Sequence, residues 1–179
     1  MKRFSLLAAL LCCAILPGCV TYHLGSMLPP DIRTVFVPTC QNMTTEPFLE
    51  QDVTSALMAA IQMDGSLKLV PEEKDADVVL NVVIRDFTLD PVGYESGSAN
   101  TVEEYRMTLI ASIVLQLTSN GTVIVEAPSV KGWEDFDFTG DLTSSKAVAL
   151  RPAAEDLGRR IVNEIVMYWP ESSDTDPTE

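Results

Sequence analysis

The chain has almost none of the side chains that catalysis and metal binding most often use. It has one histidine, His23, and four cysteines, three of which lie within the first 19 residues. No serine stands in a G-x-S-x-G turn, and no glycine-rich loop joins a strand pattern to a helix pattern as a phosphate site requires. His23 has no cysteine or carboxylate cluster at metal-ligand spacing beside it, so we interpret it as a surface residue. We therefore expect no catalytic residue, no metal site and no cofactor, and a protein that is not an enzyme.

Positive charge is also scarce. The chain carries 12 Lys and Arg against 26 Asp and Glu, a formal net charge of −14. Without a basic stripe it cannot displace the counterions of a phosphate backbone, which excludes nucleic acid as a partner. Glu134, Asp135 and Asp137 lie close together, but neighbouring residues of a strand point to opposite faces. The pattern favours a solvated edge over a calcium site.

A run of apolar residues long enough to cross a bilayer is missing too. The N-terminal run from Phe4 to Leu16 has about a dozen residues where a spanning helix needs ~20, and Lys2 and Arg3 precede it. A basic start followed by a short apolar run is typical of a secretory signal. We predict a signal peptide over residues 1–18.

The end of this signal resembles a lipobox. It reads Leu16-Pro17-Gly18-Cys19, with a small residue before a cysteine whose thiolate can take a diacylglyceryl group. We predict cleavage between Gly18 and Cys19 and lipidation of Cys19; the alternative is an ordinary signal with an incidental cysteine. Each buried methylene of an acyl chain contributes ~0.8 kcal/mol, so a triacylated cysteine would be anchored permanently.

The segments before and after the predicted domain indicate where in the cell envelope the protein is anchored. Val20 and Thr21 follow the cysteine instead of the aspartate that resembles an inner-membrane retention signal, which favours the periplasmic side of the outer membrane. Residues 19–31 contain one glycine and two prolines and are interpreted as a lipidated tether. Residues 170–179, PESSDTDPTE, are predicted to be an acidic disordered tail. Removal of the signal leaves Cys40 as the only cysteine without a lipid, and we interpret it as a small buried hydrophobe.

Residues 32–169 predict one domain that begins with a strand and a helix. Ile32 to Pro38 alternates in the manner of a strand and ends at proline. Asn42-Met43-Thr44 matches a glycosylation acceptor but is better interpreted as a strand-to-helix turn. Thr44 or Thr45 is expected to cap the helix, with Pro47 in its first turn and Gly65 as a left-handed C-cap. The inward stripe of this helix consists of Leu49, Val53, Leu57, Ala60 and Ile61.

The middle of the domain predicts a series of strands. A short one covers Leu67 to Val70, and a longer one covers Ala76 to Phe87. Asp90-Pro91 is expected to start a mobile loop that includes residues 93–100. In the strand from Glu104 to Thr118, one face is apolar at nearly every second position, namely Tyr105, Met107, Leu109, Ala111, Ile113, Leu115 and Leu117.

A hairpin and a second helix complete the pattern. Asn120-Gly121 is expected to form a type I′ turn with positive φ at both residues. Pro128 interrupts the return strand from Thr122, which predicts an edge strand or a bulge. The last helix is expected to begin at Ser145 or Arg151, with Pro152 in a first turn, and to end at Trp169.

The side chains of this last helix divide into an inward stripe and a solvated set. The stripe consists of Leu150, Ala154, Leu157, Ile161 and Ile165; the solvated residues are Arg159, Arg160 and Glu164. Trp133 and Trp169 are interpreted as half-core residues, with interface anchors as the alternative. The fold class is α+β, with two helices packed on one face of a mostly antiparallel or mixed four-to-five-stranded sheet.

An ordered set of residues resembles a known family. After Cys19 come Tyr22-His23-Leu24 and Leu28-Pro29, then the strand IRTVFVP from Ile32, and then Asn42, Thr44, Glu46-Pro47 and Leu49-Glu50; Ala76-Asp77-Val78-Val79-Leu80 and the Tyr105 strand follow in order. This resembles the LptE-like family of lipopolysaccharide-assembly lipoproteins over roughly residues 19–169.

The resemblance implies a subunit of the lipopolysaccharide-assembly translocon, acting as plug or chaperone of an LptD-type outer-membrane β-barrel. It leaves open whether lipopolysaccharide itself is bound. The alternative is a periplasmic lipoprotein that regulates cell-wall synthesis or supports a secretion complex, with a sandwich that resembles the N-terminal domain of TolB.

Overall fold

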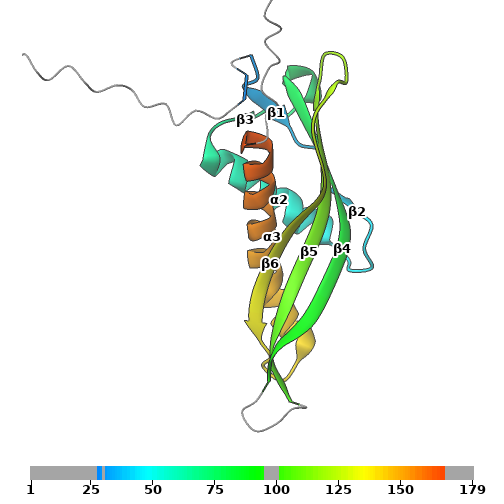
Figure 1. Cartoon of the computed structure of the whole chain (residues 1–179), viewed down its shortest axis with the longest axis vertical. Coiled ribbons are helices and arrows are strands. Elements are labelled where there is room, and N and C mark those ends of the chain that lie inside the picture. Colours follow the sequence, from blue (N-terminus) through cyan, green and yellow to red (C-terminus); the bar gives the residue numbers. More distant parts are fainter. Residues whose placement is uncertain (1–27, 30, 95–100, 168–179) are drawn as a thin grey trace, which may run out of the picture.

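The computed structural model describes residues 28–29, 31–94 and 101–167 (Figure 1). The predicted signal peptide, Cys19, His23, Trp169, the acidic tail and most of the 93–100 loop lie outside these residues. The elements follow in the order β1 (Thr34–Phe36), β2 (Gln41–Asn42), α2 (Leu49–Asp64), β3 (Lys68–Leu69), the 3-10 turn η1 (Glu73–Asp75), β4 (Val78–Tyr94), β5 (Val102–Leu117), β6 (Val123–Asp137) and α3 (Leu142–Met167).

In the described part of the chain, six strands form one mixed sheet. Its order is β3-β1-β4-β5-β6, with β2 paired to β4 beside this path. The short strands run parallel to their neighbours, whereas β4, β5 and β6 form an antiparallel meander. Both helices lie against one face of this sheet (Figure 1). The predicted α+β class is confirmed, and the sheet has one strand more than expected because β2, which has only two residues, was not predicted.

The core lies between the helices and the inward face of the meander. The predicted inward positions of β5 from Met107 to Leu115 have no exposed surface. Opposite them, α2 buries Leu49, Val53, Ala56, Leu57 and Ile61, and α3 buries Ala154, Leu157, Ile161 and Ile165 among others. The predicted stripes are confirmed except for Ala60 and Leu150, which are only partly buried.

Strand β4 is longer than the sequence suggested. It continues through Asp90 and Pro91 to Tyr94, where a loop was expected, and Pro91 faces Tyr105 of β5. On its other side β4 pairs with β1 and β2 only as far as Ile84. The missing N–H of Pro91 therefore costs no ladder hydrogen bond, because this end of β4 has no described strand on its outer side.

Helix α2 begins at Leu49, later than predicted. The hydroxyl of Thr44 is used in a turn, in which it donates to Asn42 Oδ1 at 2.8 Å and accepts the Glu46 N–H at 3.2 Å. Phe48 precedes the helix in the left-handed region (φ 66°), and no side chain caps the helix there. At the other end the prediction is confirmed, because Gly65 has φ 75° and donates its N–H to Ile61.

The hairpin between β5 and β6 is not a type I′ turn. Gly121 has φ 72°, but Asn120 is not among the described residues with positive φ. The Gly121 N–H donates to Leu117 and the Thr122 N–H donates to Asn120 Oδ1, so a four-residue loop replaces the two-residue turn. The return strand β6 is an edge strand with a bulge at residues 128–129, as Pro128 predicted.

Helix α3 begins at Leu142, earlier than predicted, and Pro152 lies in its interior. Asp141 explains the early start, because its carboxylate accepts the N–H groups of Thr143 and Ser144. This is the pattern of an N-cap. The proline is accommodated inside a helix of 26 residues whose packing against the sheet outweighs the lost bond.

Candidate functional site

The outward face of β4, β5 and β6 has no described helix over it (Figure 1). Its side chains alternate with the core residues and are mostly polar or half-buried: Asn81, Val83, Arg85, Thr108, Ile110, Ser112, Val114, Gln116, Glu126 and Lys131. We call this surface the open face. It is where the sheet can meet a ligand or partner without disturbing the core.

Two cations on the open face have no acidic partner within the described ranges. Arg85 on β4 donates from Nε to Ser112 Oγ at 2.9 Å and from Nη1 to Met43 Sδ at 3.3 Å. Lys131 on β6 is exposed, and its register partner on β5 is Ile110. Opposite Ile110 on β4 is the exposed Asp86, and Arg85 is the extra residue of the β-bulge just before it. The two cations therefore lie on either side of β5, across about 10 Å of sheet.

The other arginine on this face is already neutralised. Arg106 makes a bidentate contact with Asp135, from Nε to Oδ1 and from Nη2 to Oδ2, both at 2.7 Å. Hydrogen bonding from Arg106 lowers the pKa of Asp135 below its ordinary value. Within residues 28–29, 31–94 and 101–167 no group of three or more His, Cys, Asp and Glu is placed to hold a metal ion. Asp135 is thus one half of an ion pair, and the open cations are Arg85 and Lys131.

Arg160 does not point freely into solvent, contrary to the prediction. Its Cζ lies 3.7 Å from the centroid of the Trp133 ring, and its Nε donates to Asp156 at 2.6 Å. Asp156 also accepts the backbone N–H of Trp133 at 3.1 Å. Burial raises the pKa of Asp156, but the bonds from Arg160 and Trp133 offset this, so its pKa lies below the ordinary value. These three residues fasten the edge of β6 to α3.

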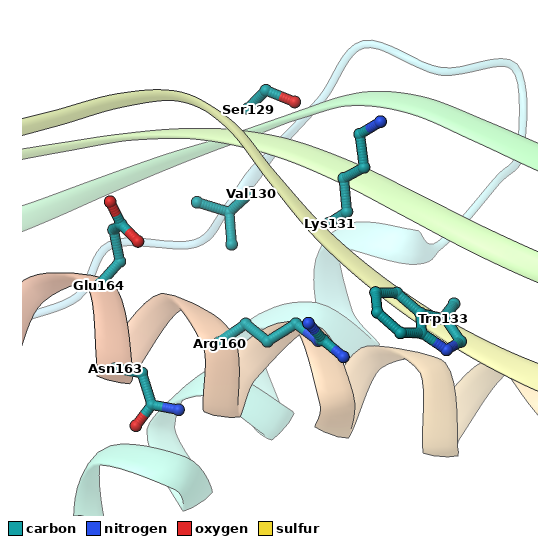
Figure 2. A pocket seen from close by; sticks show the side chains of 7 residues that line it. All are labelled: Ser129, Val130, Lys131, Trp133, Arg160, Asn163 and Glu164. Atoms are coloured by element: carbon teal, nitrogen blue, oxygen red, sulfur yellow. The ribbon is translucent and has the colours of Figure 1, made fainter.

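A cavity of about 450 Å³ opens beside this fastening (Figure 2). It is lined by Ser129, Val130, Lys131, Trp133, Arg160, Asn163 and Glu164. Figure 2 shows the Lys131 side chain pointing away from α3, whereas Arg160 lies beside the Trp133 ring between strand and helix. The two cations of this region therefore have different roles: Arg160 is a structural contact, and Lys131 is available on the open face.

Gly132 fixes how closely the helix approaches the strand. A Cβ atom at this position would lie 2.4 Å from the backbone nitrogen of Leu157. Only glycine allows so close an approach of α3. The position of β6, and with it the outward direction of Lys131, is thus set by backbone contact with the helix.

The groove between α2 and α3 makes a useful contrast. Its cavity of about 530 Å³ includes Arg151 and Arg159 in its lining, yet both pair with acids on α3. Arg151 contacts Glu155 at 3.0 Å and Arg159 contacts Asp156 at 3.2 Å. The groove therefore offers no unpaired guanidinium.

Cys40 is buried, as predicted, with 3% of its surface exposed. Burial raises the pKa of its thiol, which keeps the thiol protonated and unreactive. Neither Arg85 nor Lys131 was predicted from the sequence as a site residue. The sequence does place a cation at an outward position in each of two strands. That a single strand separates these two cations is visible only in the folded sheet.

The comparisons with known proteins give a family and a fold. No helix of the described ranges is both long and apolar enough to span a membrane. No curated protein sequence matches the chain. A solved Xanthomonas campestris protein of the DUF330 family is similar, with a TM-score of 0.54, 13% identity, and coverage of 78% of this chain and 89% of that one.

Two further solved structures have lower TM-scores. A minor lipoprotein from Acinetobacter baumannii has a TM-score of 0.49 and 12% identity, covering 76% of this chain and 94% of that one. The PelC dodecamer from Paraburkholderia phytofirmans has a TM-score of 0.40 and 17% identity, covering 74% and 91%. The model of the lipopolysaccharide-assembly family LptE matches residues 32–165, which include every described strand and nearly all of α3. The chain therefore belongs to the LptE lipopolysaccharide-assembly family.

Proposed function

We propose that this protein is an outer-membrane lipoprotein subunit of the lipopolysaccharide-assembly translocon, held to the periplasmic side through Cys19. In this role it acts as plug and chaperone of an LptD-type β-barrel and performs no chemical step. Family membership over residues 32–165 supports the assembly role. The lipobox-like LPGC segment supports the anchor.

The open face is the observation that carries the contact with lipid. Lipopolysaccharide presents phosphate groups next to acyl chains, so a surface that binds it needs cations beside apolar side chains. Arg85 and Lys131 lie on either side of the strand that carries the half-buried Ile110, and neither makes an ion pair within the described residues. A net charge of −14 repels anions at long range, but short-range binding depends on the local cations.

The shape of the domain also suits a seat inside a barrel. The lumen of an outer-membrane barrel is polar, whereas its lipid-facing surface is apolar. The described domain buries most of its large apolar side chains between sheet and helices, although some, such as Phe48 and Val148, are exposed, and its open face is mostly polar or half-buried. Such a surface can lie in the hydrated lumen of a barrel, because it does not need apolar side chains of the barrel to cover it.

Extraction of native membranes with mild detergent tests the partner. We expect an affinity-tagged chain to co-purify with an integral β-barrel protein, and its depletion to reduce lipopolysaccharide at the cell surface. Recovery of a lone lipoprotein, with normal surface lipopolysaccharide after depletion, would contradict the proposal. A defect in cell-wall synthesis that precedes any change in surface lipid would favour the regulatory alternative.

The anchor is tested separately from the partner. Replacing Cys19 by serine should abolish acyl labelling and release the chain into the periplasm. The matched control is Cys40→Ser, which removes the buried thiol and should leave acyl labelling unchanged. Continued labelling of the Cys19→Ser chain would contradict the assignment of the lipid site.

A further inference from the structure

Met43 lies beside one of the two cations of the open face. Its side chain is 61% exposed, and its Sδ accepts a hydrogen bond from Arg85 Nη1 at 3.3 Å. The main chain holds this methionine in place, because the Met43 N–H donates to the Ile84 carbonyl at 2.9 Å and β2 pairs with β4 immediately before it. The sulfur therefore lies next to the guanidinium because of the fold of the β2–α2 connection.

The turn around Met43 is fixed on its other side as well. Asn42 Oδ1 accepts the N–H and the hydroxyl of Thr44, and Asn42 Nδ2 donates to the Glu46 carbonyl at 2.8 Å. Glu46 is in turn paired with Lys146 of α3 at 2.7 Å. A chemical change at the sulfur is therefore transmitted first to Arg85, since the backbone around it has little freedom to move away.

The chemistry of a thioether makes this contact sensitive to oxidants. A thioether sulfur is a weak hydrogen-bond acceptor, whereas a sulfoxide oxygen is strongly polar. With hypochlorous acid, a sulfur lone pair takes the oxygen, an S–O bond forms and the O–Cl bond breaks. Sulfur loses two electrons, chlorine gains them and leaves as chloride, and the proton goes to water. The new oxygen would stand where the weak acceptor now faces Arg85.

Two other methionines of the described ranges lack either the exposure of Met43 or its hydrogen bond from a cation. Met107 is fully buried, and Met63 is 85% exposed but accepts no described hydrogen bond from a cation. Met43 combines exposure with a hydrogen bond from a guanidinium. It is therefore accessible to an oxidant and coupled to the proposed binding face.

We propose that Met43 is an oxidative modification site that regulates the open face. Its sulfoxide binds the Arg85 guanidinium and withdraws it from phosphate-bearing ligands. The inference rests on the proposed contact between this face and lipopolysaccharide, and it adds a reversible control, because sulfoxide reductases restore the thioether.

The test uses the full lipidated protein in mild detergent, with fluorescently labelled lipopolysaccharide as the probe. After treatment with hypochlorous acid, peptide mass spectrometry measures the sulfoxide at each methionine. We expect oxidation to raise the Kd for the probe about tenfold or more, the size expected when a hydrogen bond to a charged group must be broken before binding. Reduction of the sulfoxide should restore the original Kd.

Two matched variants assign the effect to one sulfur. Met43→Leu keeps the apolar volume but cannot be oxidised, so its Kd should be unaffected by the oxidant. Met63→Leu removes an exposed methionine that accepts no described hydrogen bond from a cation, and this variant should lose affinity on oxidation as the original chain does. Equal loss in Met43→Leu, or unchanged affinity with Met43 fully oxidised, would overturn the proposal.

A readout that needs no lipid separates this inference from the proposed function. Phenylglyoxal modifies accessible guanidinium groups, and we expect Met43 oxidation to slow its reaction with Arg85 but not with Arg151. If the unoxidised protein does not bind the probe, the lipid contact fails while the Arg85 reaction still decides whether the sulfoxide engages it. If binding is normal and oxidation leaves the Arg85 reaction unchanged, the inference fails and the proposed contact stands.

Discussion

The two faces of strand β5 are made from alternating residues of one segment, yet they differ in packing and charge. On the covered face Met107, Leu109 and Ala111 have no exposed surface. On the open face Ile110 and Ser112 are half-buried, and the cations Arg85 and Lys131 lie on the strands at either side. A single residue step along the strand therefore separates the side chains that stabilise the core from those that we propose bind lipid.

The largest effect is expected from a pair of neighbours that tests this separation directly. Leu109→Ala empties a fully buried position and should lower the free energy of unfolding by about 3 kcal/mol. Ile110→Ala removes a half-buried side chain from the open face and should cost about 1 kcal/mol. Urea denaturation of both variants measures the difference. Equal losses would mean that the open face is buried in the folded protein.

The next largest effect on stability is expected at Gly132, where α3 approaches β6 most closely. Gly132→Ala places a methyl group 2.4 Å from the Leu157 nitrogen, so α3 must shift. We expect a loss of about 2 kcal/mol in unfolding free energy. Lys131→Ala, one residue earlier and pointing outward, should stay within about 0.5 kcal/mol of the original chain. A Gly132→Ala variant of unchanged stability would show that the helix is not held against β6.

The open face predicts the opposite result, a loss of binding without a loss of stability. The double variant Arg85→Ala, Lys131→Ala should weaken binding of phosphorylated lipopolysaccharide by about tenfold or more, because two charge-assisted contacts are removed. Its unfolding midpoint should stay close to that of the original protein. Probe from which the phosphates have been removed is the control and should bind both proteins alike. An unchanged Kd for the phosphorylated probe would exclude this face as the lipid contact.

Much of the fold follows from local patterns in the sequence. The alternation in β5, the stripe of α2 and the cap at Gly65 each depend on residues close in the chain, and each is confirmed. Pro128 predicted a bulge or an edge, and β6 has both, because a residue without an N–H avoids the interior of a ladder.

The predictions that were wrong concern residues whose structure depends on contacts with distant segments of the chain. Pro91 is tolerated in β4 because no described strand pairs with the outer side at that point. Arg160 was expected in solvent, but it stacks on the ring of Trp133. Trp133 lies on β6, more than 20 residues earlier in the chain, so the local pattern of α3 could not reveal this contact. The candidate site has the same origin, since Arg85 and Lys131 lie near each other only because β4 and β6 both pair with β5.

The smallest effect on stability is expected at the junction between β1 and the start of β4. The Asp77 carboxylate accepts the N–H of Arg33 and of Thr34, both at 2.9 Å, and the Thr34 hydroxyl at 2.7 Å. These bonds, chiefly the one from the Arg33 N–H, lower the pKa of Asp77 below 3.8. A depressed carboxyl pKa stabilises the folded state above the unfolded pKa, and this contribution is lost as the pH falls through the folded pKa.

The variant Asp77→Asn isolates this term, because its side chain has the same shape but does not titrate. At neutral pH it should be less stable than the original chain by about 1 kcal/mol, a modest value because solvent screens the site. The gap should close as the pH falls below 3.8, while the other carboxyls with lowered pKa, Asp135, Asp141 and Asp156, weaken both proteins together. A gap that persists at low pH would mean that shape, and not charge, holds β1 to β4. Since this junction lies away from Arg85 and Lys131, lipopolysaccharide affinity at neutral pH should be the same in both proteins, which keeps the stability of the sheet separate from the chemistry of its open face.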